Sequence, residues 1–536
     1  MKWLGLSTSR SVQSVEKQQN LRQHLLILSI IFVAVTIIYA NVTRAYFCAY
    51  DDFDNLHQTV FEDADQPARM LTTSHFNSFK YRPGHRAINL FTYLVGDDDS
   101  TAFRVRNLAF HLVNAVLVYA LAWQLFRSFS VSGAGALLFG LHPLANQTVV
   151  GAIWTNTVAH TGFLLALVLF IASTRAKRYW SLWLIGALIS ASFGLFTYDP
   201  EIIVFGLMLL YFLLFVAWRG EAIRMPYIVL FTSVSSILIG SYFILRKLVV
   251  PNGWQQVSAL IPSPIVVGKN AMMYVIALVN PVDVVLANEL FNTPLPSEIR
   301  FTNATLVLGI ALALLLTACI GVYLPRLKHT ANRGNDWPVA LFLVSGIWAP
   351  LLPMLAFASR PSETYLYLSV AFYVLLLVYF LSRVLHKSGK PKFAFYVSVV
   401  FLAGIFSAAT WVKNDRVSEC GETVHRILHN LPENLLRKDS WMVAFANVPG
   451  EKSTRRYGFY GFRGVDTIGE GLVADGAVTH ALQLVFRNKL LSGKVVKSEE
   501  LPSMCSQTSA SRNLCVFVHW DGKIETCCSS AIAPVS

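Results

Sequence analysis

Three carboxylates lie close together in the stretch Tyr50-Asp-Asp-Phe-Asp-Asn55, shortly after the first apolar run of the chain. Carboxylates this close repel one another, which raises the pKa of at least one of them. Such a group beside lipid headgroups can take a proton from a hydroxyl or amide, as a general base does. Asp51 and Asp52 are therefore candidate catalytic residues and Asp54 a candidate binding residue. The alternative is a solvated acidic loop.

Two arginines follow in the stretch Lys80-Tyr-Arg-Pro-Gly-His-Arg86. A guanidinium can hold a phosphate through two parallel hydrogen bonds. Arg82 and Arg86, together with Tyr81, are therefore candidates for binding an anionic group. The alternative is an interfacial pair whose charged ends extend to the lipid headgroups.

Polar residues also occur inside the apolar runs. Asn107, His111 and Asn114 recur at helical spacing, so they share one face of a predicted helix. Polar side chains within a bilayer normally face a polar cavity or another helix. This face therefore belongs either to a site or to a seam of hydrogen bonds between helices. His142, followed by Pro143, interrupts a later apolar run and is a further candidate.

Four more polar residues lie where predicted helices begin on one side of the membrane. Glu201 follows Asp199-Pro200, and a later stretch, Ser359-Arg-Pro-Ser-Glu-Thr-Tyr-Leu-Tyr367, contributes Arg360, Glu363 and Tyr365. If they meet the acidic stretch and the two arginines on one outer face, they line a charged cavity at the membrane surface. Such a cavity suits a substrate that is half lipid and half polar. The alternative is helix capping and headgroup contact.

The elements that position these residues are membrane helices. The chain has 536 residues, of which 54% are hydrophobic and only 14% charged, against about 25% charged residues in a soluble domain. Its mean hydropathy is +0.50. The net charge of +13 reflects basic cytoplasmic loops. Nucleic-acid binding is not indicated, because the sequence has no basic patch interleaved with aromatic residues. The chain is predicted to be an integral multi-pass membrane protein.

About eleven runs are long enough to cross a bilayer, and the basic loops alternate in the way that successive crossings require. The N-terminus is predicted to be cytoplasmic and the C-terminus exterior. One apolar stretch, residues 265–290, is broken by polar residues and is predicted to be re-entrant or to lie in the interface. The predicted spans are residues 25–40, 105–126, 133–154, 157–174, 180–197, 202–218, 227–245, 304–324, 337–355, 365–381 and 393–411.

The predicted fold is mainly α, a polytopic membrane helix bundle with a small exterior α+β domain at its C-terminus. The membrane module covers residues 1–411, with a first exterior loop at 41–102 and another at 247–302 that holds the re-entrant segment. Residues 412–536 form the soluble domain, with strands predicted at 441–445 and 515–519. Outside the cytoplasm its late cysteines can pair.

The order of these motifs resembles the polytopic GT-C glycosyltransferases. The resemblance is greatest to the O-mannosyltransferase branch with transmembrane and tetratricopeptide regions and to its bacterial relatives. It rests on Asp51-Asp52, on Tyr81-Arg82-Pro83, on the Asn107 helix face and on Phe139-Gly-Leu-His-Pro143. The tetratricopeptide repeats are absent. Where the branch usually carries charges, this chain has Gln147, no arginine near Asn156, Asp199-Pro200 in place of the lysine before Glu201, and Thr364.

The resemblance implies transfer of a sugar, mannose or a related hexose, from a polyprenyl- or dolichyl-phosphate carrier to a protein or glycan acceptor at the exterior face. Asp51 or Asp52 would act as the base of an inverting attack, and arginines would stabilise the departing lipid phosphate. No cofactor is implied and no metal-ligand cluster is evident. The implied substrate-binding set comprises Asp54, Tyr81, Arg82, Arg86, Asn107, His111, His142, Glu201, Arg360, Glu363 and Tyr365.

Two other classes of function stay open. A transporter of a polar or lipid-linked solute is disfavoured because the charges cluster at one set of helix ends instead of the membrane midplane. A catalytically inactive scaffold that binds a partner through its exterior tail stays open because of the missing charges. A bacterial inner membrane is the expected location, with the endoplasmic reticulum membrane as the alternative.

Overall fold

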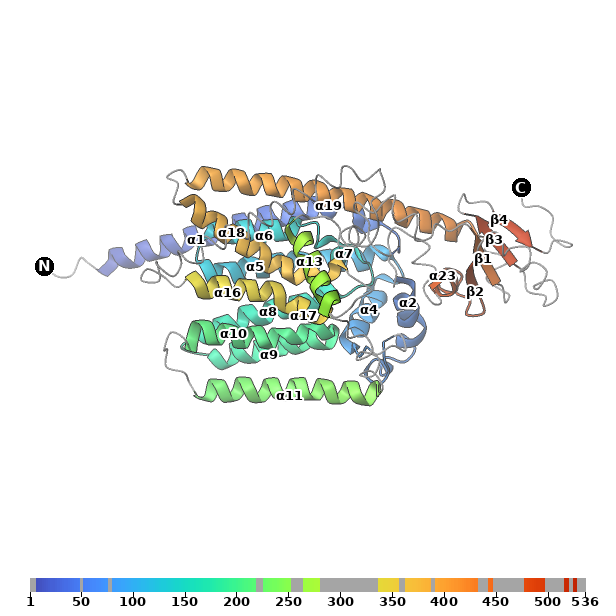
Figure 1. Cartoon of the computed structure of the whole chain (residues 1–536), viewed down its shortest axis with the longest axis horizontal. Helices are drawn as coiled ribbons and strands as arrows, with labels where there is room; N and C mark the ends of the chain where they lie inside the picture. Colours follow the sequence, from blue (N-terminus) through green and yellow to red (C-terminus); the bar gives the residue numbers. More distant parts are fainter. Residues whose placement is uncertain are drawn as a thin grey trace.

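The computed structural model describes twelve ranges of the chain, and Figure 1 shows them as a bundle of long helices with a small sheet at one end. The N-terminus lies at the opposite end of the bundle from the sheet and from helices α2 and α4. The described ranges are residues 6–48, 52–75, 80–217, 225–251, 264–279, 336–355, 362–386, 391–431, 442–446, 477–496, 515–519 and 524–527.

Nine helical segments of the described chain are long and apolar enough to cross a membrane. A helix satisfies its backbone hydrogen bonds internally, which lipid cannot do for it. These segments confirm nine of the predicted spans. They are α1 (Leu6–Tyr39), α5 (Ser100–Phe126), α8 (Asn156–Arg175), α9 (Trp180–Thr197), α10 (Ile203–Phe212) with its flanking turns η3 (Asp199–Ile202) and η4 (Leu213–Ala217), α11 (Met225–Val249), α16 (Asp336–Trp348) with α17 (Leu352–Leu355), α18 (Tyr367–His386) and α19 (Pro391–His429).

The single span predicted at residues 133–154 is wrong. The structure has a short α6 (Phe129–Leu141) followed by the one-turn helix α7 (Asn146–Val150). His142 takes an extended conformation after α6, because the residue before a proline is disfavoured in the helical region. The predicted span at 304–324 lies outside the described residues. Of the predicted re-entrant segment, α13 (Pro264–Val279) is described, and its Asn270 donates a hydrogen bond to the carbonyl of Leu355.

The first loop is largely helical. It contains η1 (Asn41–Arg44), α2 (Asp52–Gln58), the π-turn η2 (Thr59–Asp63), α3 (Arg69–Thr72) and α4 (Pro83–Gly96). Helix α4 starts with a proline, whose missing N–H is not needed in the first turn, and it has two contrasting faces. One face buries polar side chains, whereas Phe91, Leu94 and Val95 are about 70% exposed on the other. This apolar outer face suits a helix that lies in the membrane interface.

The small C-terminal domain has a four-stranded sheet in the order β2-β1-β3-β4. The strands are β1 (Met442–Ala446), β2 (Ser492–Val496), β3 (Cys515–His519) and β4 (Ile524–Cys527), with β1 parallel to β2 and β3 and with β4 antiparallel to β3. Helix α23 (Ala477–Phe486) packs on β2, where Val478 and Leu482 contact Gly493. Both predicted strands and the α+β class of this domain are confirmed.

Helix α19 continues through the domain boundary that the sequence predicts at residue 412. Val417, Gly421, Val424 and Leu428 are buried beyond that point, and this spacing of three or four residues marks one continuous helical seam. The boundary therefore moves to the end of α19. The polar composition after Trp411 reflects departure from lipid, and the helix itself persists.

Candidate functional site

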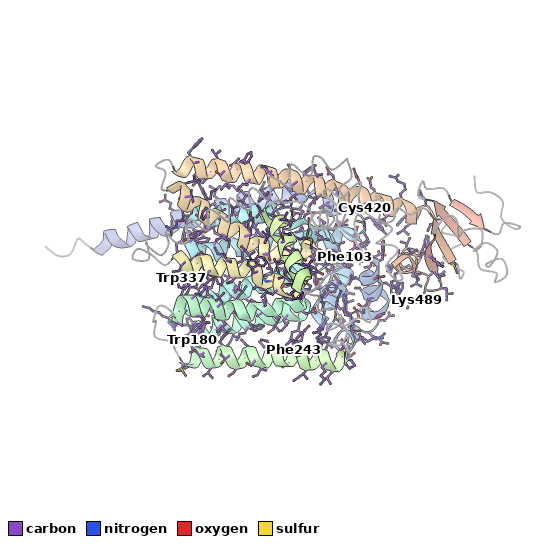
Figure 2. The ribbon with its side chains drawn as sticks, in the orientation of Figure 1. Phe103, Trp180, Phe243, Trp337, Cys420 and Lys489 are labelled. Carbon is purple, nitrogen blue, oxygen red and sulfur yellow. The ribbon has the colours of Figure 1, made fainter. Side chains whose placement is uncertain are left out.

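The polar candidates gather at the end of the bundle that carries α2, α4 and the sheet. Figure 2 shows Cys420 and Lys489 towards that end and Trp180 and Trp337 at the opposite end. The acidic stretch, α4 and the starts of α5 and α8 supply most of the buried polar groups there. Below, this region is called the loop end of the bundle.

Asp52 is fully buried at the start of α2. Its Oδ2 accepts the backbone N–H of Cys48 at 3.0 Å, and its Oδ1 accepts the N–H of Ile153 at 3.3 Å. The carboxylate thus joins the first loop to the segment after α7. Asp51, its neighbour in the sequence motif, lies outside the described residues.

Asp54 faces the C-terminal domain. Its Oδ1 lies 2.6 Å from Nδ1 of His480 on α23. The ring of His480 also stacks on His57, with centroids 4.1 Å apart, and Nε2 of His57 lies 2.8 Å from Oε1 of Gln483. Burial, and then the nearby charge of His480, lowers the pKa of His57 to about 4. Helix α2 therefore docks the C-terminal domain through a cluster of histidine and acidic side chains.

The two arginines of the first loop both have carboxylate partners. Arg86 is buried and ion-pairs with Asp63, with Nε 3.0 Å from Oδ2, while its Nη1 donates to Thr73 Oγ1 at 2.6 Å. Arg82 reaches Asp199 at 2.5 Å and lies over the ring of Tyr198 at 4.6 Å. Arg82 is partly exposed, with 14% of its side chain accessible. It is the better placed of the two to meet a ligand.

Tyr81, between Lys80 and Arg82, is buried. Its hydroxyl donates to the carbonyl of Leu71 at 3.3 Å, and its ring lies near those of Phe196 and Tyr242. This residue therefore anchors the start of α4 against α9 and α11.

The polar face of α5 is a seam between helices. Asn107 donates to the carbonyl of Gly151 at 2.6 Å. The two ring nitrogens of His111 lie 2.7 Å from the Tyr367 hydroxyl and 3.0 Å from the Gly140 carbonyl. Asn114 donates to the same hydroxyl at 3.0 Å. These contacts join α5 to α6 and α18, as one of the two interpretations of this face predicts.

Two arginines at the start of α5 were not predicted as site residues from the sequence. Arg104 is buried and donates to the carbonyls of Ala45 at 2.9 Å and Tyr46 at 2.8 Å, and to that of Val150. It clamps the segment that precedes Asp52. The sequence could have indicated these residues, because two arginines inside an apolar run are costly in lipid unless their side chains have polar partners.

Arg106 has an unusual set of partners. Its guanidinium donates to Asn89 Oδ1 at 2.8 Å, to Thr92 Oγ1 at 3.1 Å, and to the carbonyls of Ala152 and Trp154 at 3.0 and 3.2 Å. Its Nε donates to the neighbouring asparagine side chain at 3.1 Å. All of these acceptors are neutral, so among the described residues Arg106 carries a positive charge without a carboxylate partner.

Arg106 lines a large apolar groove. The groove has a volume of about 880 Å³ between α4, α5 and α9. Gly84 lets α4 approach α9, because a Cβ at that position would lie 2.5 Å from Thr197 Oγ1. The groove is lined by Leu71, Pro83, Gly84, Ala87, Ile88, Phe91, Thr92, Val95, Ala102, Val105, Arg106, Phe110, Val158, Phe193 and Phe196.

A second, much smaller cavity holds Glu201. Its Oε1 lies 2.6 Å from Nδ1 of His160, and both side chains are almost fully buried. Oε2 of Glu201 and Nε2 of His160 have no hydrogen-bond partner within the described structure. Tyr365, the neighbouring candidate from η8 (Glu363–Leu366), lines the same cavity with Thr364. Two unsatisfied polar atoms beside a cavity suit a bound water or a polar ligand group.

The sequence indicated neither His160 nor the packing that positions Glu201. Helices α8 and α9 touch at Gly162, where a Cβ would lie 2.7 Å from the Ser190 carbonyl. A Cβ at Gly194 would lie 3.5 Å from Glu201. This close approach brings the histidine of α8 against the glutamate that follows α9.

Glu363 pairs with a lysine that the sequence interpretation also missed. Nζ of Lys413 on α19 lies 2.6 and 2.7 Å from the two carboxylate oxygens and 3.2 Å from the Pro143 carbonyl. His142 precedes Pro143 in the sequence, and its ring lies 4.4 Å from that of Phe406. Arg360, predicted to accompany Glu363, lies outside the described residues.

Three of the positions at which the sequence departs from the branch it resembles lie together. Gln147 Oε1 accepts the N–H of Thr364 and the hydroxyl of Ser362, both at 2.9 Å. Asn156 donates to Oγ1 of Thr364 at 3.0 Å. A neutral hydrogen-bond network therefore occupies one connected place between α7, α8 and η8, so the charge replacements are mutually consistent.

Residues 85–244, which run from α4 to α11, match a family model described as dolichyl-phosphate-mannose-protein mannosyltransferase. No curated protein matches the chain.

Among solved structures, archaeal oligosaccharyltransferase AglB from Archaeoglobus fulgidus, in complex with an inhibitory peptide and a dolichol-phosphate, is similar with a TM-score of 0.50. The two are 11% identical over 96% of this chain and 75% of that one. ArnT from Cupriavidus metallidurans bound to undecaprenyl phosphate gives a TM-score of 0.40 and 14% identity over 92% of each chain. The family model thus covers the part of the bundle from α4 to α11, and the archaeal oligosaccharyltransferase shares the polytopic helical fold of the chain.

Proposed function

We propose that this protein transfers a sugar, mannose or a related hexose, from a polyprenyl-phosphate carrier to a protein or glycan acceptor at the loop end of the bundle. The description of the matching family model supports the donor and the sugar. The similar archaeal structure was determined with a peptide and a dolichol-phosphate, which supports a lipid-phosphate donor and an acceptor outside the bilayer.

The observation that carries the proposal is the apolar groove with Arg106 in its wall. An isoprenoid chain is apolar and fits the groove, while its phosphate requires a cation. Arg106 supplies that cation because its recorded partners are all neutral. A unit charge about 4 Å away is worth about 4 kcal/mol at an effective dielectric constant of about 20. We assign Arg82, which precedes Pro83 of the groove in the sequence, as the second cation.

The acceptor is activated from the acidic stretch. We assign the base to Asp51 or Asp52, which removes a proton as the acceptor attacks the anomeric carbon from the face opposite the phosphate. The bond from carbon to the phosphate oxygen breaks, and the arginines stabilise the charge that develops on the leaving phosphate. In this proposal no metal is needed, since guanidinium groups supply the positive charge.

The remaining candidates are assigned to shape the site. Glu201 and His160 present their unsatisfied atoms to the small cavity and are placed to hold a sugar hydroxyl or a water. Asp54 and its histidine partner fix the C-terminal domain beside the acidic stretch. We place this end of the bundle outside the cytoplasm, in a bacterial inner membrane.

The donor site is tested by lipid binding to the purified protein. Arg106→Met is expected to weaken binding of a polyprenyl phosphate about a thousandfold, the equivalent of about 4 kcal/mol. Binding of the uncharged polyprenol should stay unchanged in the same variant, which controls for damage to the groove. Arg178→Met, at an exposed arginine stacked on Tyr179, should bind both lipids as the wild type does. Equal loss of both lipids in Arg106→Met would refute the assignment.

The catalytic assignment is tested by sugar transfer from a radiolabelled polyprenyl-phosphate hexose. Asp51→Asn and Asp52→Asn are compared at equal expression, and at least one should lose transfer while it still binds the donor. Undiminished transfer in both variants would remove the base from the acidic stretch.

A non-catalytic scaffold is the second candidate, because the neutral network at Gln147, Asn156 and Thr364 stands where the resembled branch carries charges. A wild-type protein that binds the carrier lipid but transfers no sugar to any acceptor tested would favour it.

A further inference from the structure

Two cysteines from distant parts of the sequence meet at the loop end of the bundle. Cys48 follows η1, is 3% exposed and lies with its Sγ 3.7 Å from the carbonyl of Val417 on α19. Cys420 is one turn further along α19, and Figure 2 labels it on that helix. The side chains of the two cysteines are hydrogen-bonded to each other. Both are free thiols in this structure.

The backbones that carry them are in direct contact. A Cβ at Gly421, the residue after Cys420, would lie 2.7 Å from the nitrogen and 2.9 Å from the oxygen of Tyr46. Arg104 holds the other side by donating to the carbonyls of Ala45 and Tyr46. Neither segment therefore needs to move far for the two sulfur atoms to bond, since a disulfide requires adjacent backbones.

We propose that Cys48 and Cys420 form a disulfide that fastens the first loop to α19. This bond would sit four residues before Asp52, whose carboxylate accepts the N–H of Cys48 at 3.0 Å. It would therefore fix the acidic stretch against the helix that carries the C-terminal domain. The inference uses the placement of this end outside the cytoplasm, where disulfides persist, and is independent of sugar transfer.

The reaction is an exchange with an oxidised disulfide, such as that of an exterior thiol–disulfide oxidoreductase. The Cys420 thiolate attacks one sulfur of the oxidant and forms a mixed disulfide, which releases the other sulfur as a thiolate. The Cys48 thiolate then attacks the Cys420 sulfur, closes the internal bond and releases the second thiolate. The two cysteine protons end on the two oxidant sulfurs, and the oxidant gains two electrons.

Cys420 is the more exposed of the two thiols and makes the first attack, and Cys48 is suited to the second, internal step. The hydrogen bond from Cys420 lowers the pKa of its thiol, and the guanidinium of Arg104 acts in the same direction, although burial opposes both. Nη2 of Arg104 lies 3.9 Å from the sulfur. The thiolate is the attacking species in thiol–disulfide exchange, and a neighbouring cation stabilises it.

The bond can be read directly from tryptic peptides of the full-length protein. Cleavage after arginine releases residues 45–69 and 417–426, and each of these peptides contains one cysteine. Membranes are treated with N-ethylmaleimide before solubilisation to block free thiols and prevent exchange. Mass spectrometry without reductant should then show the two peptides joined, and dithiothreitol should separate them. Recovery of both peptides in the alkylated form, or joined to other cysteines, would overturn the proposal.

A stability measurement gives a second, independent readout. Dithiothreitol should lower the Tm of the wild type, whereas Cys48→Ser and Cys420→Ser should start from the lower Tm and not respond further. Cys319→Ser, at a cysteine in a predicted apolar run, should keep the wild-type response. A wild type whose Tm is insensitive to dithiothreitol would contradict a disulfide that fastens the loop. Loss of sugar transfer with an intact peptide link would count against the proposed function alone.

Discussion

The buried pair of Lys413 and Glu363 gives the sharpest test of how the bundle is held together. The two side chains are 0% and 5% exposed, and Nζ lies within 2.7 Å of both carboxylate oxygens. Lys413→Met leaves the carboxylate buried without its partner, and Glu363→Gln leaves the ammonium in the same state. Breaking one partner of such a pair costs about 3–5 kcal/mol. Each single variant should therefore lose roughly 3–5 °C in Tm, because the entropy of unfolding grows with chain length.

The double variant should recover most of that loss, because a methionine beside a glutamine carries no unpaired charge. Thermal unfolding of the four proteins in one detergent, followed by the loss of the monodisperse peak on size exclusion, completes the cycle and gives the coupling energy. Lys177→Met, at an exposed lysine, should leave Tm unchanged. A double variant as unstable as the sum of the singles, or singles that match the wild type, would refute the reasoning.

Three further perturbations follow from the geometry. His57 has its pKa lowered to about 4 from 6.5 by burial and by His480, so the undocked state binds more protons between these values. Protection of α23 from hydrogen exchange should be complete above pH 6.5 and fall as the pH drops towards 4. Gly162→Val should separate α8 from α9 and lower Tm, because its Cβ site lies 2.7 Å from a facing carbonyl. Tyr367→Phe removes the hydroxyl shared by two α5 side chains, and the orphaned polar groups should cost about 1–3 kcal/mol in thermal unfolding.

Each of these perturbations has a control. His57→Gln should remove the pH dependence of the hydrogen-exchange protection of α23. If that variant keeps the same pH dependence, a group other than His57 causes it. Gly206→Val, where a Cβ would meet nothing within 4 Å, should spare Tm; equal losses at the two glycines would show that packing is not the cause. Tyr396→Phe, at an exposed tyrosine bonded only to Ser130 in the described structure, should be neutral, and an equal loss there would contradict the seam on α5.

The membrane helices are predictable because a span must be apolar along its whole length and the loops record the sidedness. The end of α6 was missed because the apolar run continues past His142-Pro143, so hydropathy conceals the break. The domain boundary was misplaced for the opposite reason. The residues of α19 after Trp411 turn polar while every third or fourth one stays buried, so composition changes before the helix ends.

Pairing among charges is what the linear pattern does not encode. Arg86 and Glu363 are visible as candidates, but their partners, Asp63 and Lys413, are defined only when distant elements pack. Arg106 was not predicted because it lies inside an apolar run. Its partners there are neutral backbone carbonyls and amide or hydroxyl side chains. Such partners leave no signature in composition or spacing.

The length of α19 determines how far the C-terminal sheet lies from the membrane-spanning part of the bundle. A helix rises about 1.5 Å per residue, so the 39 residues of α19 extend roughly 58 Å, about twice the thickness of a hydrocarbon core. The part of α19 that exceeds the hydrocarbon core extends beyond the lipid as a rigid helix, and the sheet lies near its end (Figure 1). A continuous helix of this length separates the sheet from the lipid by a distance that a flexible tether of equal length would not fix.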